Sequence, residues 1–136
     1  MSTIFSKIIS GEIQAHKVAE TNSFLAFLDI SPLARGHVLV IPKAEVEYIF
    51  DIDDPEYIEL WMFAKIVALG IKEAFPCEKV GVAVVGLEVA HTHIHLIPIN
   101  QVSDMNFNKE KLNLSHDELV EDAEKIREAL KPITKA

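Results

Sequence analysis

The sequence has very little cysteine, and it lacks any long uninterrupted run of apolar residues. Cys77 is the only cysteine among 136 residues, so the chain cannot form a disulfide bond within itself. A lone cysteine favours a reducing, cytoplasmic setting, because disulfides are typical of oxidising compartments. The apolar runs are too short for a membrane-spanning helix, which needs roughly 20 apolar residues. Met1 leads straight into a patterned segment, so we expect no signal peptide and no membrane partner.

Basic residues are also scarce compared with acidic ones. Thirteen lysines and arginines stand against 21 aspartates and glutamates, which gives a net charge of −8. A nucleic-acid-binding surface needs a basic patch, so we expect no nucleic-acid partner. A small phosphate-bearing ligand is still compatible, because local imidazoles and backbone N–H groups can hold it. The length and the 49% apolar share are ordinary for a folded chain, and we expect one domain over residues 1–136.

Three histidines stand at alternate positions in one short aliphatic stretch. His91, His93 and His95 are separated by β-branched residues, which favour a strand. Alternate side chains of a strand lie on one face, roughly 6.5–7 Å apart, so we expect the three imidazoles to line the same face. Imidazoles titrate near neutrality and are costly to bury unpaired, which favours a functional cluster. Two alternatives remain open here: a shared metal ion or metal-free covalent catalysis by imidazole.

The stretch from His91 to Ile97 resembles the signature of the histidine triad (HIT) family, His-x-His-x-His followed by two apolar residues. Three earlier blocks resemble that family in the same order: Ile4–Ile13, Phe27–Pro32 and Gly36–Lys43. The resemblance implies an α+β fold, with an antiparallel sheet of about five strands, helices packed on it, and a homodimer. It also implies a hydrolase or transferase that attacks the α-phosphate of purine nucleotide derivatives of the phosphoramidate type, through a nucleotidyl-histidine intermediate. The alternatives are a dinucleoside polyphosphate hydrolase and a nucleotide-binding module with little turnover.

The resemblance implies a role for each histidine of the site. His93 matches the nucleophile, and His95 matches the residue that contacts the phosphate and delivers a proton to the leaving group. His91 matches the residue that orients its neighbours, and His37 matches an auxiliary histidine near the phosphate. No cofactor is expected.

The resemblance also implies a nucleotide pocket. Asp29 follows an apolar strand, where an acid alone is most often a turn former. In the family, the matching carboxylate accepts hydrogen bonds from both ribose hydroxyls, which it can do without a donor of its own. The expected pocket comprises Ile4, Phe5, Ile8, Phe27, Asp29, Ile30, Gly86, Glu88 and Val89.

Two departures from the family pattern bear on metal binding and on turnover. Some members hold structural zinc on two cysteines and two histidines, but here Thr3, Ser6 and Glu45 occupy three of those four positions. We therefore expect no metal. Leu87 stands where the family usually has glutamine, in a shortened apolar passage, and we expect slower turnover from a phosphate loop with fewer polar groups.

Periodicity and turn residues predict the other elements. The expected strands are Val18–Thr21, Phe24–Leu28, His37–Ile41, Val80–Val85 and Val89–Ile99, with a loop over Asn100–Asn113. The expected helices are Phe5–Ile9, Glu45–Phe50, a long helix from a cap at Asp54 to Phe75, and a C-terminal helix of about 115–131 that Pro132 ends. The long helix carries an apolar stripe of Tyr57, Trp61, Ala64, Ala68, Ile71 and Phe75, and a second apolar flank of Ile58, Met62, Ile66 and Leu69. This excess of apolar surface predicts a subunit interface.

Overall fold

The computed structural model describes residues 3–134, and these residues form a five-stranded antiparallel sheet with helices packed on it. The strands are β1 (Lys17–Glu20), β2 (Phe24–Leu28), β3 (Val38–Pro42), β4 (Lys79–Ala83) and β5 (Ile94–Ile99). They lie side by side in the order β1-β2-β3-β5-β4. The helices are α1 (Ile4–Ile9), α2 (Asp54–Ala74) and α3 (His116–Thr134), with 3-10 turns η1 (Ile49–Asp51) and η2 (Val102–Met105). The predicted α+β class and antiparallel sheet are confirmed. None of the helices within residues 3–134 has both the length and the apolar character needed to cross a membrane.

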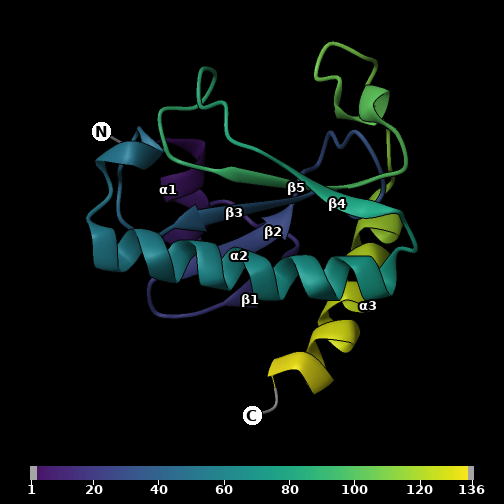
Figure 1. Cartoon of the computed structure of the whole chain (residues 1–136), viewed down its shortest axis with the longest axis horizontal. Coiled ribbons are helices and arrows are strands. Elements are labelled where there is room, and N and C mark those ends of the chain that lie inside the picture. Colours follow the sequence, from purple (N-terminus) through teal and green to yellow (C-terminus); the bar gives the residue numbers. More distant parts are fainter. Residues whose placement is uncertain (1–2, 135–136) are drawn as a thin grey trace.

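The two faces of the sheet are covered by helices of very different length (Figure 1). Side chains alternate between the faces, so Phe24 and Val40 pack toward α2 and α3, whereas Phe27 and Leu39 pack toward α1. Helix α2 has 21 residues and α3 has 19, but α1 has only six. The short cover leaves part of the α1 face open, and the histidines lie there.

Strand β5 begins at Ile94, so it contains only the last of the three alternate histidines. Just before it, the N–H and the hydroxyl of Thr92 both donate to the Val46 carbonyl at 2.7 Å. These bonds tie the chain to the loop after β3 and keep it out of the sheet ladder. The predicted strand is therefore wrong over residues 89–93.

The same contact explains why the short helix predicted at Glu45–Phe50 does not form. The Val46 carbonyl accepts from Thr92, so it is not available to a helical N–H four residues later. A loop leads instead to the 3-10 turn η1.

The ends of the long helices differ from the predictions by a few residues. Helix α2 has Asp53 rather than Asp54 at its N-cap, and the first helical bond runs from the Tyr57 N–H to the Asp53 carbonyl at 2.8 Å. Pro132 lies inside α3 instead of ending it. A proline in the last turn removes only one N–H, and the Thr134 hydroxyl donates to the Leu130 carbonyl across it.

Helix α2 buries a stripe that is rotated from the predicted one. Its buried residues are Leu60, Phe63, Ala64, Val67, Gly70 and Ile71. The rotation follows from contact with α3, because a Cβ at Gly70 would come within 2.5 Å of Leu130 Cδ2. Ile58, Met62 and Leu69 remain 50–60% exposed.

Helix α3 is attached to the loop that carries one of the site histidines. A capping box starts the helix, with Ser115 and Glu118 each accepting the other's backbone N–H at 2.9–3.1 Å. Farther along, the Arg35 guanidinium donates twice to the fully buried Asp122 carboxylate, at 2.7 and 3.0 Å. This two-point contact holds the loop before β3, and therefore His37, in place.

Candidate active site

Backbone carbonyls determine which nitrogen carries the proton in two of the histidines. A carbonyl oxygen only accepts, so a ring nitrogen that bonds to one must donate. His91 Nε2 lies 2.7 Å from the Pro42 carbonyl, and His93 Nδ1 lies 2.8 Å from the His91 carbonyl. A neutral His93 therefore has its proton on Nδ1 and a free electron pair on Nε2, which is the form that a nucleophile requires.

His37 and His95 form a buried hydrogen-bonded pair whose protons are fixed in the same way. The Leu33 N–H donates to His37 Nδ1 at 3.0 Å, so a neutral His37 has its proton on Nε2. That proton is donated to His95 Nδ1, 3.0 Å away. The proton of a neutral His95 is then on Nε2, opposite to the arrangement in His93.

Burial keeps this pair neutral near pH 7. Desolvation, helped by the positive charges of His95 and Lys111, lowers the pKa of His37 to about 3. Desolvation, followed by the charge of His93, lowers the pKa of His95 to about 4. Desolvation also lowers the pKa of His91, against the opposing effect of its bond to the Pro42 carbonyl.

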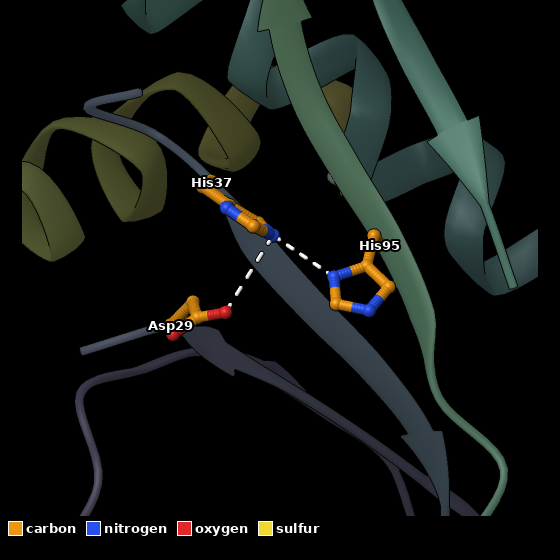
Figure 2. Close-up of side chains that lie close together, drawn as sticks. All are labelled: Asp29, His37 and His95. Carbon is orange, nitrogen blue, oxygen red and sulfur yellow. Dashed lines mark hydrogen bonds and ion pairs between the residues drawn. The ribbon is translucent and has the colours of Figure 1, made fainter. Parts of the chain in front are cut away.

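Asp29 stands beside this pair (Figure 2). Figure 2 shows Asp29, from the end of β2, and His95, from β5, approaching the same nitrogen of His37. The Asp29 Oδ2 lies 3.7 Å from His37 Nε2, while Oδ1 accepts the Ser31 N–H at 2.9 Å. Burial raises the pKa of Asp29, although the Ser31 N–H and the charge of His93 oppose this. Asp29 thus forms, through Oδ1, the turn that is expected of an acid after a strand. Its other oxygen, Oδ2, is directed at His37.

The hydrogen bonds of His37 argue against a metal ion at this group. One ligand atom from each of Asp29, His37 and His95 lies within 4.8 Å of the others. To bind a metal through Nε2, His37 would need its proton on Nδ1. That proton would then face the Leu33 N–H, a second donor, across 3.0 Å. The hydrogen bonds suit two neutral imidazoles that each carry one proton, and these residues do not suit a metal ion.

The residues at the family's zinc positions are also engaged in other bonds. The Ser6 hydroxyl accepts the Thr3 N–H at 2.6 Å, and the Thr3 hydroxyl accepts the Ser6 N–H at 3.2 Å. This capping box starts α1. His91 Nδ1 is buried and has no hydrogen-bond partner among the described residues. A single nitrogen cannot hold zinc, which in structural sites takes four ligands, mostly thiolates and imidazoles.

A cavity of about 610 Å³ opens on the α1 face beside His93 and His95. His91 and His37 lie behind its wall, where they contact the other histidines. The cavity is lined by every residue that the sequence predicted for the nucleotide pocket: Ile4, Phe5, Ile8, Phe27, Asp29, Ile30, Gly86, Glu88 and Val89.

Four rings follow one another along the cavity. The centroid of Phe5 is 5.0 Å from that of His93, and His93 is 5.0 Å from His95. The next ring is Phe107, with its centroid 4.8 Å from His95. The row gives the cavity an apolar end at Phe5, two histidines in the middle and a far end at Phe107.

The far end is formed by residues that the sequence reasoning missed. Phe107, Asn108 and Lys111 line the cavity, although they belong to a polar segment predicted only as loop. A single aromatic residue within a polar segment was the available signal. Leu87 also lines the cavity, but its side chain is 88% exposed, so it points mostly into solvent.

Comparisons with known proteins agree with this geometry. The family model of the HIT domain matches residues 10–102, which is more than half of the chain. Adenosine 5′-monophosphoramidase hnt1 of Schizosaccharomyces pombe is 37% identical over 99 residues, which cover 72% of this chain and 74% of that protein.

Solved structures of similar proteins share the fold over almost the whole chain. A HIT-like protein of Bartonella henselae, described as involved in cell-cycle regulation, superposes with a TM-score of 0.82 at 32% identity. The match covers 94% of this chain and 96% of that one. A zinc-bound histidine triad protein of Mycobacterium smegmatis also has a TM-score of 0.82, at 26% identity, covering 99% and 97% of the two chains.

Proposed function

This chain belongs to the histidine triad (HIT) family, and we propose that it cleaves phosphoramidate-type derivatives of purine nucleotides at the α-phosphate. The observation that carries the proposal is the opposite protonation of two neighbouring histidines. His93 presents a free electron pair on Nε2, and His95 presents a proton on Nε2, with their rings 5.0 Å apart. A nucleophile and a proton donor side by side suit the displacement of an amine from phosphorus. The S. pombe relative, whose name is adenosine 5′-monophosphoramidase, supports this substrate class.

The proposed reaction has two steps. In the first, His93 Nε2 bonds to the α-phosphorus, the bond from phosphorus to the leaving nitrogen breaks, and the His95 Nε2 proton passes to that nitrogen. His95 is left as an imidazolate, whose negative charge is balanced by the positive charge of the His93 ring, which keeps its Nδ1 proton while bonded to phosphorus. In the second, water attacks the phosphorus of the nucleotidyl-histidine. The proton of that water restores His95, and His93 leaves as neutral imidazole. His91 holds His93 through its carbonyl, and His37 holds His95 through its Nε2–H.

The rest of the cavity supports a nucleoside on the Phe5 side. Phe5, Ile8 and Phe27 offer apolar surface for a base, and the rings of Phe5 and Phe27 are 5.6 Å apart. The Asp29 carboxylate can accept hydrogen bonds from ribose hydroxyls. The volume of about 610 Å³ lies in the range of small-molecule sites.

We also propose that the protein is a cytoplasmic homodimer. Ile58, Met62 and Leu69 leave an apolar, 50–60% exposed face on α2, a helix that contacts the edge strand β4 of the sheet. Exposed apolar patches of this kind mark association surfaces. Met62→Lys should shift the sedimentation coefficient from dimer to monomer, and a wild-type chain that sediments as a monomer would refute the dimer.

The test of the function is AMP release from adenosine 5′-phosphoramidate, followed by chromatography. We expect wild type to release AMP and ammonia in equal amounts and to form a 5′-nucleotidyl adduct on His93 that can be trapped by an alkaline quench, because its P–N bond is labile to acid and stable to base. Faster cleavage of a dinucleoside polyphosphate than of the phosphoramidate would identify the protein as a dinucleoside polyphosphate hydrolase instead. Tight AMP binding without release from either compound would identify a nucleotide-binding module.

A further inference from the structure

The segment from Asn106 to Leu112 closes the cavity beyond His95. The Phe107 ring contacts the His95 ring, with centroids 4.8 Å apart. The Leu112 N–H donates to the Pro32 carbonyl at 2.8 Å, which ties the segment to the loop that leads to His37. The Asn108 N–H donates to the Asn106 side chain at 3.0 Å. These bonds hold the segment as an ordered wall of the site.

Lys111 supplies the positive charge of this wall. Its ammonium donates to the Phe107 and Lys109 carbonyls, at 2.5 and 3.3 Å, which uses two of its three N–H donors. The third donor is available to a ligand. Among the described residues that line the cavity, Lys111 is the only lysine or arginine, whereas Asp29 and Glu88 are acidic. Its charge also acts on Asp29, where it partly offsets the rise in pKa that burial causes.

The position of Lys111 relative to the ring row indicates what it binds. The row of rings runs from Phe5 through His93 and His95 to Phe107. The Lys111 ammonium donates a hydrogen bond to the Phe107 carbonyl, at the end of this row. In the proposed reaction the base lies toward Phe5, and His95 gives its proton to the departing group. The part of the substrate beyond His95 is therefore the leaving group.

We propose that Lys111 binds a negatively charged group, a carboxylate or a phosphate, on the leaving group of the substrate. This inference rests on the proposed function and narrows its substrate class to nucleotides that carry an anionic leaving group. An ammonium that lines the cavity with a free donor favours an anion strongly over a neutral group, because it adds charge to the hydrogen bond. The Phe107 ring offers apolar surface next to that anion.

The test uses two pairs of adenosine 5′-phosphoramidates that differ only in the charge of the leaving amine. One pair carries phenylalanine or phenethylamine, and the other carries phosphoethanolamine or ethanolamine. For each pair, kcat/KM is measured for wild type, for Lys111→Gln, which keeps N–H donors but no charge, and for Lys111→Arg. The ratio of kcat/KM for the anionic member to that for the neutral member is then compared between each variant and wild type. This comparison cancels the intrinsic difference between the leaving amines.

We expect Lys111→Gln to lower kcat/KM about tenfold for the anionic members and less than twofold for the neutral members, which is the lower end of the effect of a hydrogen bond to a charged group. Lys111→Arg should restore the preference. Lys109→Gln removes a charge from the same segment outside the cavity, and it should change no ratio. A preference confined to the carboxylate pair or to the phosphate pair identifies the source of the anion.

Two results would overturn the inference. An equal loss for charged and neutral members would show that the ammonium holds the α-phosphate that all substrates share. Unchanged rates would show that it only braces the loop. If no compound is cleaved, the proposed reaction is wrong, but the inference about Lys111 can still be tested. The affinities of the same pairs are then measured by calorimetry. A tighter anionic member in wild type that loses its advantage in Lys111→Gln supports the inference, and equal affinities or no binding refute it.

Discussion

Two pairs of histidines in this protein have almost the same ring geometry and very different surroundings. His16 and His116 have ring centroids 5.2 Å apart at an interplanar angle of 54°, and His37 and His95 have the same two values. The second pair is only 1% and 8% exposed, whereas His116 is exposed and His16 is half-buried. Distance between rings therefore does not distinguish a candidate site from a surface contact.

Burial and backbone hydrogen bonds make the difference. The Leu33 N–H orders the protons of His37, and through it those of His95. Desolvation lowers the pKa values of these two rings to about 3 and about 4. At His16, desolvation and the charges of His116 and Arg127 also lower the pKa, but this ring lies outside the cavity. A buried pair whose protons are held on defined nitrogens can take part in proton transfer, whereas a solvated pair only changes the local charge.

The largest expected effect separates the two pairs by activity. His93 lies next to the buried pair, and His93→Ala should lower phosphoramidate turnover at least about a hundredfold, because it removes the nucleophile. The fold should persist, as seen by circular dichroism, since His93 sits at the cavity wall. His116→Ala is the matched control and should keep full turnover. Near wild-type rates in His93→Ala would end the covalent mechanism.

A smaller effect is expected at the carboxylate that faces the buried pair. Asp29→Ala should weaken AMP binding by about 1.5–3 kcal/mol, which is typical of hydrogen bonds to a charged group. The 2′,3′-dideoxy analogue should bind wild type weakly and respond little to the mutation, and calorimetry measures both. If Asp29→Ala weakens both ligands equally, the carboxylate acts through its turn with Ser31 and not through the ribose.

The acid stability of the protein should depend on the buried pair. The folded pKa values of His37 and His95 lie below the ordinary 6.5, so between these values the unfolded chain binds more protons. Their contribution is complete above about pH 6.5 and is lost as the pH falls, toward about 4 for His95 and about 3 for His37, by at most about 1.4 kcal/mol per pH unit for each ring. Urea unfolding of His37→Gln should show a shallower pH slope than wild type, and His16→Gln should keep most of the slope. Identical slopes in all three proteins would contradict the burial of the pair.

Local patterns predicted the parts of the site that are close together in sequence. The alternation around His93 placed it and His95 toward one cavity, and the block around Asp29 brought that residue to the same place. The proton positions could not be predicted, because the groups that fix them are the Pro42 and His91 carbonyls and the Leu33 N–H, whose orientations only the folded chain determines.

Long-range packing explains the other failures. The buried stripe of α2 depends on where α3 lies, and the contact between Gly70 and Leu130 joins residues from separate helices. Lys111 follows no periodic pattern, so only the folded chain shows that it lines the cavity. The predicted effect of Leu87 on turnover stays a prediction, and its 88% exposure shows that its side chain lies mostly in solvent.

The smallest expected effect concerns the surface pair itself. His116→Ala should raise the pKa of His16 toward its ordinary value, because it removes one of the positive charges that lower it, while the desolvation and the charge of Arg127 remain. The free energy of unfolding should change by less than about 0.5 kcal/mol, as is usual for exposed positions. The alanine also removes a cation from the first turn of α3, where a positive charge is unfavourable, so any change should be slightly stabilising at low pH. An NMR titration of the imidazole carbon-bound protons measures the pKa, and urea unfolding measures the stability. An unchanged pKa of His16 would show that the two rings are apart in solution, and a loss of turnover would show that the surface pair is coupled to the buried one.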